Sequence, residues 1–177
     1  MNRFKKGYVH IYTGTGKGKT TAALGQALRA AGSGLKTFFV MFMKDFSYGE
    51  IQSIKHLSDW IRLEQYGNDA FVFRKQQPDN NDIETALHAL NQVREAMLST
   101  KYDMVIMDEV CVAIHFELLK TEDVLSLFDE KPEPVELILT GRYCSPELIE
   151  KADLVTEMQE VKHYYQKGVA ARKGIES

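Results

Sequence analysis

Apolar segments of strand length alternate with longer amphipathic or alanine-rich segments along most of this chain. Six segments with an apolar, β-branched or aromatic bias predict β-strands: Tyr8–Tyr12, Lys36–Met43, Ile61–Tyr66, Asp103–Glu109, Val135–Gly141 and Leu154–Met158. Five segments predict helices: Ala22–Ala31, Gly49–Trp60, Ile83–Ser99, Thr121–Phe128 and Pro146–Ala152. Continuous apolar runs are typical of strands that are covered on both faces. The alternation therefore predicts an α/β fold, with a mostly parallel sheet and helices on both faces.

Glycine, proline and short polar residues mark the ends of several of these elements. Gly32 and Gly34 predict the end of the first helix, and Pro78–Asp82 predicts a loop and cap before the longest one. That helix carries apolar residues at helical spacing, namely Ala86, Leu87, Leu90, Val93 and Met97. Between these regions, Gly67–Asp69 breaks the chain before a β-like segment, Ala70–Phe73.

A chain of 177 residues is long enough to bury a core, and we expect residues 1–177 to form a single domain. The net charge of −3 argues against nucleic acid as a partner. No apolar run reaches membrane-spanning length, and no apolar signal core follows the basic N-terminus, so we expect a soluble, cytoplasmic protein without a membrane partner. Cys111 and Cys144 form no CxxC pair and are interpreted as small buried hydrophobes in a reducing compartment.

The candidate chemistry begins in a glycine-rich loop between the first predicted strand and helix, with the residues Gly14, Thr15, Gly16, Lys17, Gly18, Lys19, Thr20 and Thr21. Backbone N–H groups can crowd around triphosphate oxygens only where Cβ atoms are absent, and the N-terminus of the following helix favours the same anion. Lys19 adds a mobile positive charge, and the Thr20 hydroxyl can bind the Mg²⁺ that accompanies a nucleotide. The alternative interpretation is a flexible connection between strand and helix.

Two further features refine this phosphate site. The usual pattern has its first glycine where this chain has Thr13, and the nearest glycine is Gly14, so the loop departs slightly from the common form. The apolar strand that ends in Asp108 and Glu109 would deliver a carboxylate to Mg²⁺, directly or through water. Together the loop and the acidic strand end predict a site for a metal–nucleotide complex.

These parts alone do not select a reaction, because phosphate loops serve kinases, hydrolases, motors and some transferases. The chain lacks an Asp-x-His-x-x-Gly segment, which commonly supplies a histidine ligand to a corrin cobalt. Four histidines show no metal-ligand spacing and are expected in ordinary surface or core roles: His10, His56, His88 and His115.

Three stretches resemble the ATP:corrinoid adenosyltransferases of the phosphate-loop type, and the match covers nearly the whole chain. They are Gly14–Ala23 with its shifted glycine, Val105–Glu109, and Leu137–Arg142 continuing through Ala152–Met158 and Val161–His163 to Gly168-Val169 and Gly174-Ile175. General kinases and motors do not share the third stretch. The resemblance implies a P-loop NTPase-like (RecA-like) fold.

It also implies that ATP is a co-substrate and a reduced corrinoid (cobalamin) the acceptor. In this family Co(I) attacks C5′ of the ribose, and the triphosphate leaves; the nucleotide lies reversed relative to that of kinases. The resemblance makes Lys19 a catalytic residue, gives the loop Gly14–Thr21 the triphosphate, and assigns Mg²⁺ to Thr20, Asp108 and Glu109. Preorganised donors of this kind are each worth about 3 kcal/mol to a transition state.

The family prepares Co(I) by displacing the lower axial ligand of the corrin with aromatic side chains, and the matching residues here are Phe71 and Phe73. The alternative is that both are core residues on one face of a strand. Lys44, Gly49 and Glu50 match a family segment near the active site without an assigned role, and Arg142 is expected to reach phosphate or ribose unless it forms a surface salt bridge.

The resemblance further implies an electron-donating reductase or flavoprotein as partner and a homodimer. Some members carry an N-terminal extension whose helix covers the active site across the dimer. Only a few residues precede the first predicted strand here, so we expect that cover to be absent or replaced. Two rival functions remain: a phosphoryl-transferring kinase or NTPase, and a nucleotide-gated module that binds a corrinoid without chemistry.

Overall fold

The computed structural model of this chain describes residues 5–45, 49–68, 70 and 77–176. Its centre is one six-stranded sheet in which all neighbouring strands run parallel, in the order β3-β2-β4-β5-β1-β6. The strands are β1 (Val9–Thr13), β2 (Thr37–Phe42), β3 (Ile61–Tyr66), β4 (Met104–Asp108), β5 (Glu136–Thr140) and β6 (Leu154–Glu157). The predicted α/β fold with a parallel sheet is confirmed.

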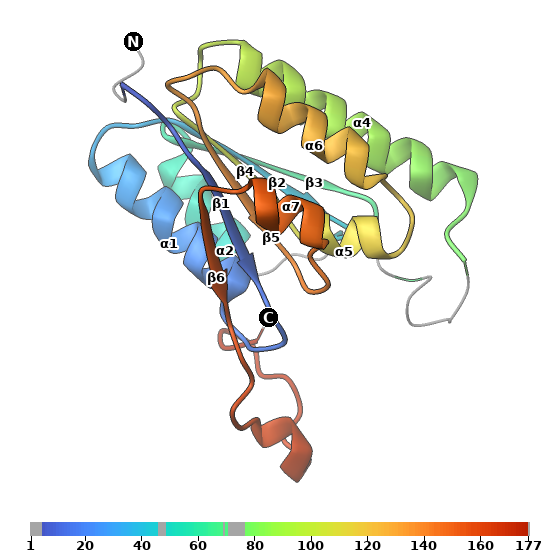
Figure 1. The fold of residues 1–177 in the computed structure, drawn as a ribbon. Coiled ribbons are helices and arrows are strands. Elements are labelled where there is room, and N and C mark those ends of the chain that lie inside the picture. The colour runs from blue at the N-terminus through green and yellow to red at the C-terminus, as the bar shows by residue number, and fades with distance from the viewer. Residues whose placement is uncertain (1–4, 46–48, 69, 71–76, 177) are drawn as a thin grey trace.

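Helices cover both faces of this sheet (Figure 1). One face carries α1 (Lys19–Gly32), α2 (Gly49–Ile54) and the 3₁₀ helix η1 (Lys55–Leu57). The other face carries α4 (Asn80–Leu98), α5 (Val110–His115), α6 (Thr121–Glu130) and α7 (Pro146–Lys151). Within the described ranges, no helix is long and apolar enough to cross a membrane.

The central strands are buried on both faces, as their continuous apolar runs predict. Every residue of β2 and β4 is buried. On one face, Ala23 and Ala27 of α1 are fully buried, and their small side chains let this helix lie close to the sheet. The core is therefore two apolar layers, one on each side of the strands that end at the candidate site.

Two helices begin earlier than predicted, and one short helix was not predicted. Helix α1 begins at Lys19 rather than Ala22, directly after Gly18 in a left-handed conformation. Helix α4 begins at Asn80 rather than Ile83, because Asp79 is its cap: the Asp79 carboxylate accepts the N–H of Asp82 at 2.9 Å. The prediction that Pro78–Asp82 is all loop and cap was therefore wrong for its last three residues. Helix α5 was not predicted at all.

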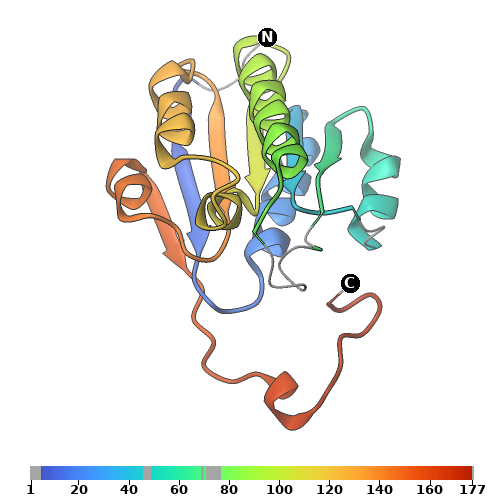
Figure 2. The same cartoon turned by 90° about the vertical axis from the view of Figure 1, so that its right-hand side faces the viewer.

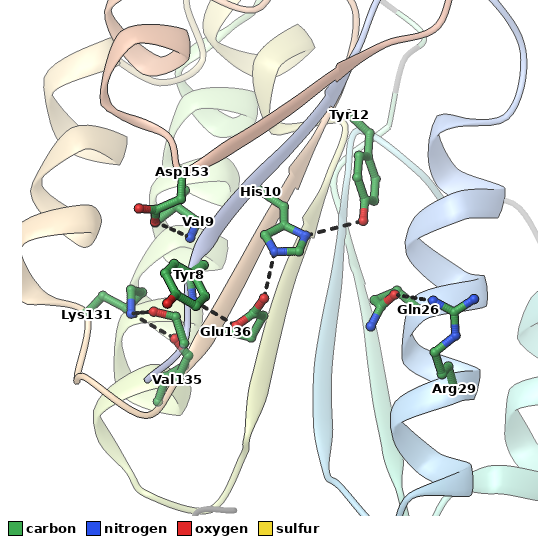
Figure 3. Close-up of polar contacts among 11 residues, drawn as sticks. Tyr8, Val9, His10, Tyr12, Gln26, Arg29, Lys131, Val135, Glu136 and Asp153 are labelled. Atoms are coloured by element: carbon green, nitrogen blue, oxygen red, sulfur yellow. Dashed lines mark hydrogen bonds and ion pairs between the residues drawn. The ribbon is translucent and has the colours of Figure 1, made fainter. Parts of the chain in front are cut away.

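The amino end of β1 is fixed on both sides by side-chain contacts (Figure 3). His10 Nε2 lies 2.7 Å from Glu136 Oε1, and the other carboxylate oxygen of Glu136 accepts the N–H of Tyr8 at 2.8 Å. On the side of β6, Asp153 Oδ2 accepts the N–H of Val9 at 2.8 Å. Because β1 is held at its amino end by these contacts and is paired along its length with β5 and β6, the loop that follows it starts from a defined position.

The chain after β6 leaves the sheet, passes beyond its carboxyl edge and folds back, so that the C-terminus approaches the region of α1 and α2 (Figures 1 and 2). This C-terminal tail, residues 158–176, contains the 3₁₀ helix η2 (Tyr164–Lys167). Its end is held by Glu176, which accepts the hydroxyl of Tyr164 and pairs with Arg172 at 3.2 Å. The Arg172 guanidinium also lies over the Tyr164 ring, 4.8 Å from its centroid.

Candidate functional site

The glycine-rich loop packs against the first residues of the C-terminal tail. The N–H of Gly16 donates to the carbonyl oxygen of Met158 at 2.6 Å. Gly14 has φ +97°, and a Cβ at this position would lie 2.4 Å from the same oxygen. A Cβ at Gly16 would lie 2.8 Å from it. The glycine at position 14 is therefore required by the close approach of this chain's own backbone as well as by its conformation.

Lys19 lies across its own loop. Its amine donates to the carbonyl oxygens of Gly14 at 2.8 Å and Gly16 at 2.7 Å, and only 7% of the residue is exposed. Burial, the largest effect, lowers the pKa of Lys19, while the nearby Glu109 carboxylate raises it. The loop thus holds a cation at its centre, at the N-terminal end of α1, where backbone N–H groups are available to an anion.

The carboxyl ends of β4 and β5 form a buried polar cluster beside this loop. Asp108 is fully buried, and its Oδ1 accepts the hydroxyl of Thr140 at 2.6 Å. The same hydroxyl oxygen accepts the N–H of Glu109 at 2.9 Å. The other oxygen of Asp108, Oδ2, lies 2.6 Å from the amine of Lys44, which follows β2. Lys44 also donates to the Thr20 hydroxyl at 3.4 Å, so one amine joins the phosphate loop to the acidic strand end.

The side chain of Glu109 points in a different direction from that of Asp108 and lies in a different environment. It has φ +62°, in the left-handed region, and is the residue from which α5 begins. The alternation of side chains along β4 ends here, and the Glu109 side chain lines a cavity rather than the core. Burial, and then the negative charge of Asp108, raise the pKa of Glu109, whereas Lys44, Lys19 and Arg142 lower it.

A cavity of about 770 Å³ lies over the loop at the carboxyl edge of the sheet. The predicted site residues that line it are Thr15, Gly16, Lys17, Gly18, Lys19, Thr20, Thr21, Glu109 and Arg142. Gly14 and Asp108 do not line it and lie behind the residues that do. Phe71 and Phe73 fall outside the described residues.

The C-terminal tail supplies one wall of this cavity, to which the sequence analysis gave no role, although Val161–His163 and Gly174-Ile175 carried part of the family resemblance. Glu160, His163 and Glu176 line it, and the Lys17 amine donates to the carbonyl oxygen of Ile175 at 2.8 Å. The Nδ1 of His163 accepts the N–H of Tyr165 at 3.1 Å, which leaves Nε2 as the hydrogen-bearing nitrogen of the neutral ring. The tail has no strand or helix pattern that would have placed it here. Lys44, Gly49 and Glu50, which had no assigned role, also line the cavity.

The opposite charges of this cavity are partly separated. Four cations line the cavity around the loop: Lys17, Lys19, Lys44 and Arg142. The Glu109 carboxylate lies near the last three of them. The other lining carboxylates come from the tail, Glu160 and Glu176, and from α2, Glu50. An extended ligand with a polyanionic end and a neutral, hydroxyl-bearing end matches this distribution, because the first end pairs with the amines and the second can hydrogen-bond to carboxylates and imidazole.

A solved structure with the same fold is that of the flagellar accessory protein FlaH from Methanocaldococcus jannaschii. The TM-score is 0.62 at 14% sequence identity, and the match covers 86% of this chain and 71% of that one. At this identity the likeness concerns the fold alone, and it agrees with the P-loop NTPase-like arrangement expected from the sequence.

Other relatives match this chain over nearly its whole length. The corrinoid adenosyltransferase of Sinorhizobium sp is 34% identical over 97% of this chain and 81% of its own length. The corrinoid adenosyltransferase of Escherichia coli K12 is 32% identical over 97% of this chain and 86% of its own length. The corrinoid adenosyltransferase CobA of Salmonella typhimurium is 34% identical over the same shares of the two chains. The model of the family described as ATP:corrinoid adenosyltransferase BtuR/CobO/CobP matches residues 5–177. This chain therefore belongs to the ATP:corrinoid adenosyltransferase family.

Proposed function

We propose that the cavity over the phosphate loop binds ATP and presents its C5′ to the Co(I) of a reduced corrinoid. The observation that carries this proposal is the joint placement of Lys19, Thr20 and Glu109 around one cavity in a chain of this family. The reaction transfers the 5′-deoxyadenosyl group in adenosylcobalamin synthesis or salvage. The two electrons of Co(I) form the Co–C bond, and the C5′–O bond breaks with its electron pair on the triphosphate.

The departing triphosphate gains negative charge at the ribose end, and the site offers fixed positive groups for it. Lys19 is held by two carbonyl oxygens at the centre of the loop, and Arg142 lines the cavity from the carboxyl end of β5. Donors that are already in position at the transition state contribute about 3 kcal/mol each. No general base is needed, because the nucleophile carries no proton.

We assign the metal site to Thr20, Asp108 and Glu109. Their hydroxyl and carboxylate oxygens are the hard ligands that Mg²⁺ prefers, and Thr20 and Asp108 lie close enough for one lysine amine to contact both. When bound there, Mg²⁺ supplies charge neutralisation to the triphosphate. The protein's own part is to hold these oxygens at the N-terminus of α1 and the ends of two buried strands.

We assign displacement of the lower corrin ligand to Phe71 and Phe73 on the basis of the family resemblance. Phe71→Ala should reduce the rate from a Co(II) corrinoid far more than the rate from chemically supplied Co(I), because only the first route requires the easier reduction. Parallel assays from the two oxidation states measure this. Equal losses in both would indicate a packing role instead.

We further propose that the protein is cytoplasmic and forms a homodimer. Its partner would be an electron-donating reductase or flavoprotein that delivers the electron to Co(II). Co-elution with a reduced flavoprotein and light scattering of the purified chain test these two partner assignments.

The direct test supplies ATP, Mg²⁺ and Co(I) corrinoid to the purified protein. Formation of a light-sensitive Co–C product together with triphosphate is expected. ADP as the product would instead indicate phosphoryl transfer, and tight binding of both ligands without any product would indicate a binding module. Lys19→Ala should abolish turnover, whereas Lys101→Ala, at an exposed lysine before β4, should leave the rate unchanged. A normal rate in Lys19→Ala would exclude the loop as the phosphate site.

A further inference from the structure

Lys44 lies between two of the three residues to which we assign the metal, Thr20 and Asp108. Its amine lies 2.6 Å from Asp108 Oδ2 and 3.4 Å from the hydroxyl of Thr20. The side chain of Asp108 has no exposed surface, and that of Lys44 has 15%. A fully buried carboxylate needs a counter-charge, because an unpaired charge at such depth is strongly unfavourable. Lys44 supplies that charge in the protein without metal.

The donor set around this amine also fits a divalent cation. Thr20 and Asp108 offer a hydroxyl and a carboxylate, and Glu109 offers a second carboxylate at the same end of β4. The lysine amine is thus a cation that already stands where these oxygens converge. Two cations cannot share the same oxygens, because like charges a few ångströms apart repel strongly even in a partly solvated site.

From this geometry we propose that Lys44 has two successive roles. Without metal it is the counter-ion of Asp108 in the metal site, and with metal and nucleotide bound it is a triphosphate-binding residue. When metal and nucleotide enter together, Lys44 leaves Asp108 and Thr20 and pairs with triphosphate oxygens in the cavity that it already lines. The inference rests on the proposed metal site. Free metal must therefore compete with Lys44 and binds weakly. When metal arrives with a polyanion, the polyanion becomes the new partner of the displaced Lys44 amine.

The first experiment measures metal binding without nucleotide, with Mn²⁺ as the probe and its free electron paramagnetic resonance signal as the readout. Lys44→Gln keeps hydrogen-bond donors for Asp108 and Thr20 but removes the charge. It should bind Mn²⁺ at least about tenfold more tightly than the unmodified protein, because the competing cation is gone. Equal Mn²⁺ affinities would overturn the proposal.

The second experiment measures thermal unfolding in EDTA and in millimolar Mg²⁺. Lys44→Met should have a lower Tm in EDTA and should regain much of the loss in Mg²⁺, because the metal compensates Asp108. Lys131→Met is the matched control, since Lys131 is half-buried and donates to Gly7 O and Val135 O at the opposite end of β1 (Figure 3). It should lose stability without recovery in Mg²⁺. The unmodified protein should show no Mg²⁺-dependent Tm, and a clear increase would overturn the proposal even if neither Lys44 variant folds.

The third measurement concerns the second role of Lys44. In saturating Mg²⁺, Lys44→Gln should bind ATP several-fold more weakly than the unmodified protein, as measured by titration calorimetry without corrinoid. Unchanged ATP affinity would refute the triphosphate contact. None of these readouts needs adenosyl transfer. Failure to form a Co–C product would therefore refute the proposed function, while the Mn²⁺, Mg²⁺ and ATP measurements decide the role of Lys44 separately.

Discussion

Two buried threonines offer a controlled test of the polar cluster at the candidate site. Thr37 at the start of β2 and Thr140 at the end of β5 are both fully buried. The hydroxyl of Thr140 makes two hydrogen bonds, to Asp108 and from the N–H of Glu109. The hydroxyl of Thr37 has no hydrogen-bond partner among the described residues. Replacement by valine removes the same group from two opposite environments.

The expected free energies follow from these contacts. Thr140→Val removes one hydrogen bond to a charged group, worth about 1.5 to 3 kcal/mol, and one between neutral groups, worth about 0.5 to 1.5 kcal/mol. Valine has nearly the shape of threonine, so no cavity adds to this sum. The expected loss is about 2 to 4.5 kcal/mol of the free energy of unfolding. Thr37→Val removes a buried hydroxyl that gains nothing from its surroundings, and should be neutral or stabilising by about 1 kcal/mol.

Urea unfolding with linear extrapolation measures both values, in EDTA so that bound metal does not contribute. The two variants should shift the midpoint in opposite directions, or one should shift it while the other does not. If both lose the same free energy of unfolding, valine is disturbing packing and the hydrogen bonds are not decisive. A loss below about 1 kcal/mol in Thr140→Val would also refute the reasoning, because a buried carboxylate and a buried N–H would then tolerate the loss of their partner.

Gly14→Ala should cost at least about 2 kcal/mol of the free energy of unfolding, because a strained φ of +97° combines with a Cβ placed 2.4 Å from Met158 O. Gly18→Ala, with φ +116° and no atom nearer than 3.5 Å, should cost less, and equal losses would show that the close approach is unimportant. For Glu109, burial and then Asp108 raise the pKa, so between the pKa of the unfolded chain and that of the folded protein, the folded protein retains a proton that the unfolded chain has released. The contribution of Glu109 to the free energy of unfolding is therefore lost as pH rises through the folded pKa. Glu109→Gln should flatten this decline when the free energy of unfolding is measured against pH in EDTA. An unchanged dependence of stability on pH in Glu109→Gln would contradict the assignment of this decline to Glu109.

The sheet could be predicted because its strands are buried on both faces and carry the corresponding apolar runs. Helix α5 could not be predicted in the same way. Val110–His115 is a short apolar segment directly after β4, and its helical turn depends on the left-handed conformation of Glu109, which no local pattern specifies. The start of α4 was missed by three residues because Asp79, rather than a later residue, forms the capping box. Both differences arise from single backbone conformations at element ends.

The phosphate loop could be predicted because its residues are contiguous, whereas the rest of the site is assembled across the chain. Lys44 reaches Asp108 only because β2 and β4 are neighbours, although 64 residues separate the two. The tail residues Glu160 and His163 lie in a segment that is mostly exposed and irregular, so burial patterns carry no information about them. Their place in the cavity depends on how the chain turns after β6.

The two adjacent acids at the end of β4 show what local sequence leaves open. Either of them could be the metal ligand when only the strand end is known. Asp108 keeps the strand conformation and points into the buried cluster, where Thr140 and Lys44 occupy its two oxygens. Glu109 turns into the left-handed region and lines the cavity. An incoming cation can therefore reach Glu109 directly but reaches Asp108 only after Lys44 has moved. The order of these contacts, rather than the presence of two carboxylates, is what would make metal binding depend on the nucleotide.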